Sequence, residues 1–116
     1  MKKKIGQDGE DQAVAFLEGK GYVILARNFR SRFGEIDIIA YEEKTQYTVF
    51  VEVKTRSNIL VGRAEESITA TKKQHILKTA MYYLVLHPTE NMRFDLIAIN
   101  LFEEKSITHL ENIIES

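Results

Sequence analysis

Two acidic residues on neighbouring apolar segments, Asp37 and Glu52, have the spacing of a divalent-metal site. The polar linker between the segments, residues 43–46, is short enough for a β-hairpin. A two- or four-residue loop would place Asp37 directly opposite Glu52, whereas a three-residue loop would break that register. Acids opposed in this way repel each other unless a cation lies between them, and hard cations such as Mg²⁺ prefer carboxylate oxygens. With the first type of loop, the pair predicts a metal site.

Lys54 follows Glu52 by two residues, on the same face of the expected strand and about 7 Å along it. Its ammonium could orient or activate water, or stabilise charge that builds on a phosphate. The side chain of Val53 points to the other face, but its carbonyl oxygen is available as a metal ligand. The alternative is that Glu52 and Lys54 are solvated residues on an open strand face. The apolar run 49–53 favours a buried central strand, in which unpaired charges are costly.

Glu10 is a further acidic candidate, because it lies three, four and seven residues before Ala13, Val14 and Leu17. This spacing places Glu10 on the inward face of a helix. The alternative is that its carboxylate stabilises the first turn through the helix dipole. Spacing alone does not separate the two interpretations.

A second group of polar residues opens a later helix. Lys73 precedes Ile76 by three residues and extends the apolar stripe that should face the sheet. Gln74 is a site candidate too, but Thr71 and Gln74 also have the spacing of a capping box.

The arginines around these segments are candidate phosphate contacts, because guanidinium groups bind phosphate as bidentate donors. They are equally compatible with ordinary solvated surface. The candidates are Arg27, Arg30, Arg32, Arg56 and Arg63. The three histidines, His75, His87 and His109, show no metal-ligand spacing, and we interpret them as surface or cap residues.

Hydrophobic periodicity predicts the elements that position these residues. We expect helices over 8–20 and 71–87, with the second burying a stripe of Ile76, Leu77, Ala80, Met81 and Leu84. We expect strands over 22–26, 35–41, 47–54 and 93–101, a turn or irregular edge over 27–32, and a last strand or helix over 106–114. This order predicts an α/β domain, a mixed sheet with helices packed on it.

Composition narrows the class of protein. The 116 residues are 44% hydrophobic and 28% charged, which is typical of one globular domain spanning 1–116. The absence of cysteine excludes disulfides and thiolate zinc sites. No apolar stretch follows the basic start or reaches the length of a membrane span, so we expect a cytoplasmic protein with no membrane contact. The net charge is −1, but residues 20–78 hold eleven Lys/Arg against seven Asp/Glu. This excess is compatible with a basic binding region and equally with ordinary surface variation.

Taken together, these motifs resemble the PD-(D/E)xK nuclease superfamily. More closely, the chain is similar to the YraN family of small bacterial proteins, which are related in pattern to archaeal Holliday-junction resolvases. The resemblance covers nearly the whole chain. It is carried by Gly9-Glu10-Asp11, Gly21-Tyr22, Arg27-Asn28-Phe29-Arg30, Gly34-Glu35-Ile36-Asp37, Phe50 to Arg56, Lys73-Gln74 and Arg93-Phe94-Asp95. Ile36 stands where the superfamily motif often has proline.

The resemblance implies a restriction-endonuclease-like core in which Asp37 and Glu52 bind Mg²⁺ or Mn²⁺. It also implies that Lys54 assists the attacking water and that Glu10 supports the site. The expected activity is hydrolysis of DNA of unusual structure, such as junctions, flaps or single strands, linked to repair or recombination. DNA rather than RNA rests on this analogy alone. Branched substrates are symmetric and would suit a homodimer.

Two rival hypotheses remain open. The first is a noncatalytic nucleic-acid-binding or adaptor domain on the same fold, which would keep DNA affinity in chelator, with a steep salt dependence. The second is a protein-interaction module with vestigial acids, which would have no nucleic-acid affinity at modest salt.

Overall fold

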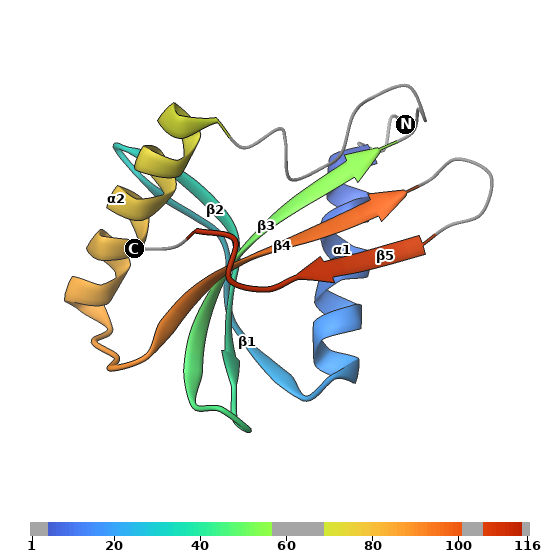
Figure 1. Cartoon of the computed structure of the whole chain (residues 1–116), viewed down its shortest axis with the longest axis horizontal. Helices are drawn as coiled ribbons and strands as arrows, with labels where there is room; N and C mark the ends of the chain where they lie inside the picture. Colours follow the sequence, from blue (N-terminus) through green and yellow to red (C-terminus); the bar gives the residue numbers. More distant parts are fainter. Residues whose placement is uncertain (1–4, 57–68, 101–105, 115–116) are drawn as a thin grey trace.

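The computed structural model describes residues 5–56, 69–100 and 106–114, and it forms three layers in which a sheet lies between two helices (Figure 1). The helices are α1 (Ile5–Gly19) and α2 (Ala70–Leu86). The strands are β1 (Tyr22–Ser31), β2 (Gly34–Glu42), β3 (Tyr47–Arg56), β4 (Met92–Asn100) and β5 (Ser106–Leu110). No helix of these residues combines the length and hydrophobicity needed to cross a membrane.

The five strands lie in the sheet in chain order, β1-β2-β3-β4-β5. Neighbouring strands are antiparallel except β3 and β4, which are parallel and are separated in the chain by α2. The expected α/β architecture with a mixed sheet is confirmed, and it is compatible with a restriction-endonuclease-like core. The strand that carries Glu52 and Lys54 is central, as its apolar sequence predicted.

The hairpin between β2 and β3 has the predicted register. Its loop has four residues, 43–46, and the ladder runs from the Glu42–Tyr47 pair to the Ile38–Val51 pair. The loop closes with a hydrogen bond from the Gln46 N–H to the Glu42 carbonyl. Continuing the ladder by one step brings Asp37 opposite Glu52.

Residues 27–32 were expected to form a turn or an irregular edge. The turn is wrong, because β1 continues to Ser31, whereas the irregular edge is confirmed, because β1 is the edge strand of the sheet. Its second half pairs with β2 from Arg27–Ile38 to Ser31–Gly34. Phe29 supplies the reason: its ring packs against Tyr83 with centroids 5.1 Å apart. The basic residues that suggested a turn point to solvent from an edge strand, where charges are tolerated. Asn28, with φ of 53°, is a local irregularity within the strand.

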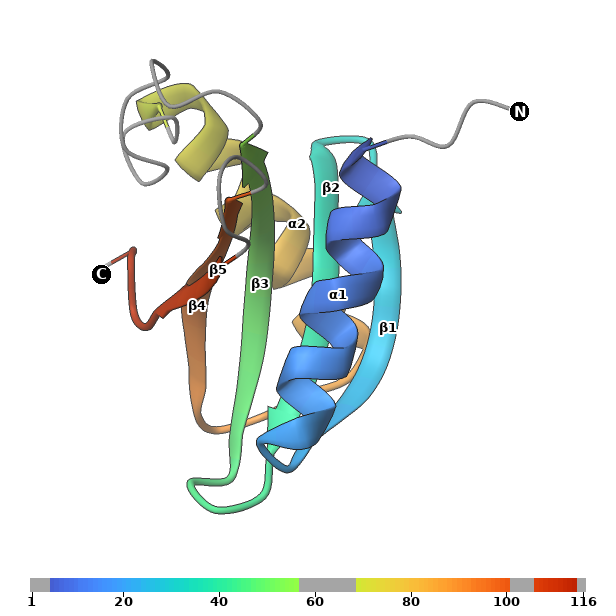
Figure 2. The same ribbon diagram turned by 90° about the vertical axis from the view of Figure 1, so that its right-hand side faces the viewer.

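Each face of the sheet is covered by one helix (Figure 2). On the first face, Ala13 and Leu17 of α1 pack against alternate residues of the strands, including Val49 and Val51. On the second face, α2 packs against Ile39 and Phe50. Ile36 belongs to the second face, whereas Ile38, two residues later, belongs to the first, so strict strand alternation does not hold here. The difference arises because Ile36 lies beyond the last pair of the β2–β3 ladder, where the strand packs against α2.

The predicted stripe of α2 is largely confirmed, because Ile76 and Ala80 are buried and Leu77 and Leu84 pack partly buried against the same core. The helix is nevertheless rotated slightly relative to that stripe. Its buried residues are Ile76, Thr79, Ala80 and Tyr83, whereas Met81 is exposed. A stripe drawn from apolar residues alone included Met81 and omitted the polar Thr79, whose hydroxyl bonds Ser31 at 3.0 Å. The orientation expected of Lys73 is wrong for the same reason: its side chain is exposed and does not extend the buried stripe.

The cap of α2 also differs from the predicted one. The N-cap is Thr69, whose hydroxyl oxygen accepts the Lys72 N–H at 3.1 Å. Thr71 and Gln74 lie inside the helix with exposed side chains, so the predicted capping box is wrong. Two threonines stand two residues apart, and only the structure distinguishes the one with extended backbone.

Replacing the N-cap threonine tests this assignment. We expect Thr69→Ala to lower the free energy of unfolding by about 1 kcal/mol, because the Lys72 N–H loses its acceptor. Thr71→Ala is the matched control and should be neutral or slightly stabilising, because alanine favours the helix interior. Urea unfolding followed by circular dichroism measures both. A larger loss for Thr71→Ala would contradict the assignment.

A buried polar cluster occupies the first face near the end of α1. The Asp95 side chain is fully buried and accepts hydrogen bonds from Arg93, from His109 Nε2 and from the Asn112 N–H. Arg93 also reaches Glu42 at 3.0 Å. Burial alone would raise the pKa of Asp95, but the bonds from His109, Arg93 and Asn112 outweigh burial and lower it.

His109 was predicted to be a surface or cap residue, and this is wrong, since its side chain is only 4% exposed. Lys20 Nζ lies 2.8 Å from His109 Nδ1. An ammonium can only donate, so Nδ1 accepts and the ring proton is on Nε2, bonded to Asp95. The cluster links α1, β2, β4 and β5 and stabilises the layer opposite α2.

Candidate active site

Asp37 and Glu52 meet where β2 and β3 separate. The ladder between these strands ends at the Ile38–Val51 pair. One residue further on, Asp37 Oδ2 accepts the Val53 N–H at 2.8 Å, in place of a strand-to-strand bond. Glu52 lies between Val51 and Val53 on β3, and its side chain is 12% exposed. The sequence-predicted acids are therefore brought together by the end of the hairpin.

The electrostatics of this pair are unfavourable in the absence of a cation. Burial raises the pKa of Asp37 to about 7, and the negative charge of Glu52 is the second cause. The hydrogen bond from Val53 opposes the shift, whereas Glu10 and Glu35 add to it. A carboxyl with this pKa is half ionised near neutral pH, and a nearby cation would favour its charged form.

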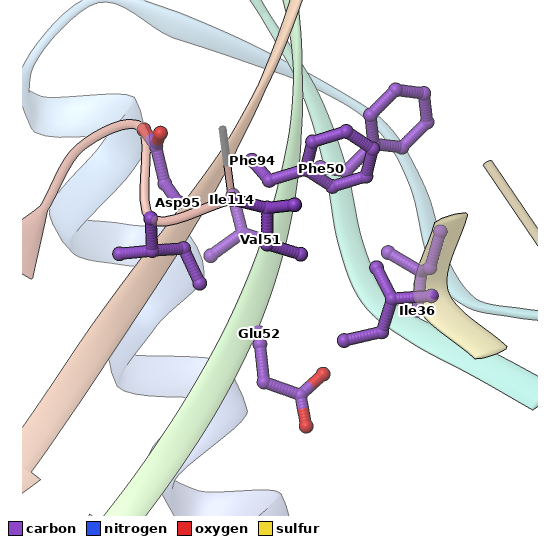
Figure 3. A pocket seen from close by; sticks show the side chains of 9 residues that line it. Ile36, Phe50, Val51, Glu52, Phe94, Asp95 and Ile114 are labelled. Carbon is purple, nitrogen blue, oxygen red and sulfur yellow. The ribbon is translucent and has the colours of Figure 1, made fainter. Parts of the chain in front are cut away.

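The Glu52 carboxylate lies at the border of an apolar pocket between the sheet, α2 and the C-terminal segment. Figure 3 shows the carboxylate turned away from the aromatic rings of Phe50 and Phe94. Those rings stack with centroids 5.2 Å apart. Ile76 and Ile114 also line the pocket. These apolar side chains pack on one side of Glu52, and its carboxylate lies on the other side.

Glu10 lies close enough to act on Asp37, but its nearest charged partner is Arg27. Its carboxylate is 3.6 Å from the Arg27 guanidinium, which also bonds Asp11 at 2.7 Å. The helix that carries Glu10 approaches β3 closely at Gly9, where an added Cβ would clash with the Thr55 hydroxyl. This contact fixes the start of α1 beside the end of β3.

The donors available fit a divalent cation of the Mg²⁺ type. Among the described residues, no three acidic or histidine side chains stand close enough to share one ion. Asp37 and Glu52 offer two carboxylates, and the Val53 carbonyl is adjacent in the chain. Mg²⁺ is commonly held by one or two carboxylates, with water and substrate phosphate completing its shell. Glu10 is close enough for its charge to act on Asp37, and its predicted part in the metal site stays a prediction.

Lys54 is half-buried and follows Glu52 by two residues on β3, so it lies on the same strand face. Phe50, which shares this face, packs toward α2. The predicted alternation along β3 is thus confirmed, and the acid and the lysine point to the α2 side of the sheet.

Sequence reasoning missed Lys72. Its Nζ lies 2.9 Å from Glu52 Oε2, and its side chain is 38% exposed. Lys72 lies four residues before Ile76 and seven before Thr79, so the stripe observed in α2 predicts its inward position. The neighbouring Lys73, which the sequence favoured, is exposed.

The predicted nucleic-acid contacts are distributed around this end of the sheet. Arg27 forms ion pairs with acidic residues of α1. The Arg30 side chain is 77% exposed, and its contact with Glu35 is longer, at 3.7 Å. Lys73 and Gln74 are exposed on the first turns of α2. The side chains of Arg56 and Arg63 lie outside the described residues.

Two cationic side chains meet at the β1–β2 turn, and the sequence did not indicate that they lie together. Arg32 and Lys78 both lie against the Phe33 ring, at 5.1 and 5.5 Å from its centroid. Gly34 brings this turn against α2, because an added Cβ would be 3.3 Å from the His75 Cβ. The turn therefore packs against α2, and this contact brings the cations Arg32 and Lys78 together at Phe33.

Comparison with known proteins identifies relatives along nearly the whole chain. A protein from Caldicellulosiruptor bescii is 44% identical over 114 residues, covering 96% of this chain and 94% of its own length. A protein from Persephonella marina is 46% identical, covering 91% and 94%. One from Clostridium perfringens is 44% identical, covering 90% and 85%. All three carry the name UPF0102 protein, which gives no activity.

Residues 9–99 match the family described as uncharacterised protein family UPF0102. That span begins beside Glu10 and includes Asp37, Glu52 and Lys54, so the match covers the candidate site. It also covers the whole sheet up to Ile99 of β4. The chain therefore belongs to the uncharacterised protein family UPF0102, the YraN family.

Proposed function

We propose that this protein is a Mg²⁺- or Mn²⁺-dependent endonuclease that cleaves phosphodiester bonds of DNA. The observation that carries the proposal is the partly buried pair Asp37 and Glu52, set at the end of a hairpin that places like charges side by side. A purely structural position would be better served by uncharged residues, because two carboxylates close together repel each other, and Lys72 pairs with only one of them, Glu52.

The roles follow from the placement of each group. Asp37 and Glu52, with the Val53 carbonyl, would hold the cation, which supplies a Lewis acid for water and for a phosphate oxygen. Lys54, on the same face as Glu52, would orient the attacking water and stabilise negative charge on the phosphate. The Val53 N–H fixes the Asp37 carboxylate. Glu10 would support the site by holding Arg27 beside it.

The substrate we propose is DNA of unusual shape, such as a junction, flap or single strand. A small single domain reads shape more readily than sequence, and the exposed cations Arg30 and Arg32 can contact phosphates without reading bases. A homodimer would suit a symmetric branched substrate. A cytoplasmic location and a link to DNA repair or recombination belong to the same proposal.

Cleavage of end-labelled DNA tests the activity. Linear duplex, single strand, flap and four-way junction would each be incubated with Mg²⁺, Mn²⁺ or chelator. We expect cutting that requires metal and is lost in Asp37→Ala. Cutting that persists in chelator would contradict the proposal.

Lys54→Ala separates catalysis from binding. We expect cutting to fall by at least about 100-fold while affinity for the same DNA changes little, since Lys54 acts on the attacking water and the developing charge. Wild-type cutting by this variant would remove Lys54 from the mechanism. If no substrate is cut by correctly folded wild-type protein, but DNA affinity survives in chelator, the noncatalytic binding domain replaces the nuclease.

A further inference from the structure

We infer that Lys72 is an exchangeable counter-ion of the candidate site: it neutralises Glu52 in the metal-free protein, is displaced by the divalent cation, and then binds a phosphate of the substrate. The inference rests on the proposed function and deepens it. It concerns a residue that sequence reasoning did not select.

The contact itself is short and partly shielded. Lys72 Nζ lies 2.9 Å from Glu52 Oε2, and the Glu52 side chain is only 12% exposed. The ammonium therefore approaches an oxygen that a cation bound between Glu52 and Asp37 would also need. A divalent cation bound to the Glu52 carboxylate would lie close to this ammonium and repel it, so the two cations compete.

The position of Lys72 in its helix suits displacement. Lys72 is the third residue of α2, and the first turn of the helix contains no acidic residue. A positive charge at a helix N-terminus is unfavourable, because it meets the positive end of the helix dipole. The pair with Glu52 offsets this cost, and once Glu52 is taken by a metal the ammonium needs another anion. The backbone of Lys72 stays fixed by its bond to Thr69, so only the flexible side chain has to move.

A phosphate is the anion that the surroundings favour. Lys78, six residues after Lys72 on α2, lies with Arg32 at Phe33. The adjacent Lys73 is exposed on the same helix turn. A substrate backbone that runs along these cations would place phosphates within reach of a lysine freed from Glu52. Lys72 would then contribute to substrate binding only when the metal is present.

Two affinities, measured on the full chain, test this exchange. The first is Mn²⁺ binding by calorimetry in the absence of DNA. We expect Lys72→Met to bind Mn²⁺ about 3-fold more tightly than the wild type, because the competing cation is gone. Lys73→Met makes the same charge change one residue away on an exposed side chain, and it should shift the Mn²⁺ affinity by less than half as much.

The second affinity is for a labelled four-way DNA junction in Ca²⁺, followed by fluorescence anisotropy. We expect Lys72→Met to bind about 3-fold more weakly, with a salt dependence reduced by about one phosphate contact. The effects on metal and on DNA thus have opposite signs. A residue that only supports the fold would weaken both affinities when changed.

Failure of the lysine exchange and failure of the proposed metal-dependent function give different results. If Mn²⁺ binds the wild type and is lost in Glu52→Gln, but Lys72→Met binds it with unchanged or weaker affinity, the exchange is wrong and the metal site stands. If no Mn²⁺ binds either the wild type or Lys72→Met, the proposed metal-dependent function fails together with the exchange. Tighter Mn²⁺ binding with undiminished DNA affinity would overturn the phosphate-binding step.

Discussion

Asp95→Ala should lower the free energy of unfolding by about 3–5 kcal/mol, the loss expected when one partner of a buried ion pair is removed. The Asp95 side chain is fully buried and accepts bonds from Arg93, His109 and the Asn112 N–H. Without the carboxylate, the largely buried Arg93 keeps only its contacts at the margin of the cluster, such as that to Glu42. Denaturant unfolding at pH 7 measures the effect.

Glu111 provides the matched control, because its carboxylate approaches the same Arg93 at 3.9 Å but is 55% exposed. Glu111→Ala should therefore change stability by less than about 0.5 kcal/mol. Similar losses for the two variants would show that burial does not set the energetics of this cluster.

The pH dependence of the Asp95 contribution has a defined sign. Its pKa is lowered in the folded protein, so the carboxylate contributes stability above its unfolded-state pKa, and this contribution is lost as the pH falls through the folded value. The difference in stability between the wild type and Asp95→Ala should be full at neutral pH. It should shrink under strongly acidic conditions, below about pH 4.

The second large effect has the opposite direction: Asp37→Asn should stabilise the metal-free protein at pH 8. Burial and the charge of Glu52 raise the pKa of Asp37 to about 7, so the folded state loses stability as the pH rises from the unfolded-state pKa through that value. Asparagine avoids this penalty and can still accept the Val53 N–H. We expect a gain on the order of 2 kcal/mol at pH 8 and almost none at pH 4.

Thermal unfolding in chelator, with and without added Mg²⁺, checks this prediction. Asp11→Asn is the control, because Asp11 is an exposed acid beside Arg27 and its replacement should give no gain. Mg²⁺ should stabilise the wild type but not Asp37→Asn, since a ligand raises stability only where it binds the folded state. Destabilisation of Asp37→Asn at pH 8 would mean that the charge of Asp37 itself is favourable in the metal-free protein.

Much of the acidic pair was predictable from the sequence, because strand alternation and loop length together determine a hairpin register. The polar linker 43–46 and the alternating residues around it predicted that Asp37 and Glu52 would face each other, and the observed four-residue loop has that register. The hydrogen bond from Val53 to Asp37 was not predictable, since it depends on where the two strands separate.

Helix α2 shows why the rest of the site was harder to predict. A stripe chosen by hydrophobicity alone includes Met81 and omits Thr79 and Tyr83. That choice rotates the helix and turns Lys73 toward the sheet in place of Lys72. Thr79 is buried because its hydroxyl bonds Ser31, a contact between residues 48 positions apart. Local patterns carry no information about such a partner.

His109 and Asp95 illustrate the same limit for polar residues in the core. Neither residue has a sequence spacing that indicates burial, because their partners include Lys20, which follows α1, and Asn112, which follows β5. The sequence around His109 is compatible with either a strand or a helix, so it does not determine which of its side chains point inward. Buried ion pairs become visible only when the sheet order is known.

The same cluster also affects how long the native state persists. Its members range from Lys20 to Asn112. They include residues of β2 and β5, the strands on either side of the parallel β3–β4 pair, so the cluster can form only after distant parts of the chain have joined. Contacts that form late in folding act on the unfolding rate more than on the folding rate. Loosening Asp95 should therefore shorten the lifetime of the native protein, and expose it to proteolysis, while the chain still folds at nearly its original rate.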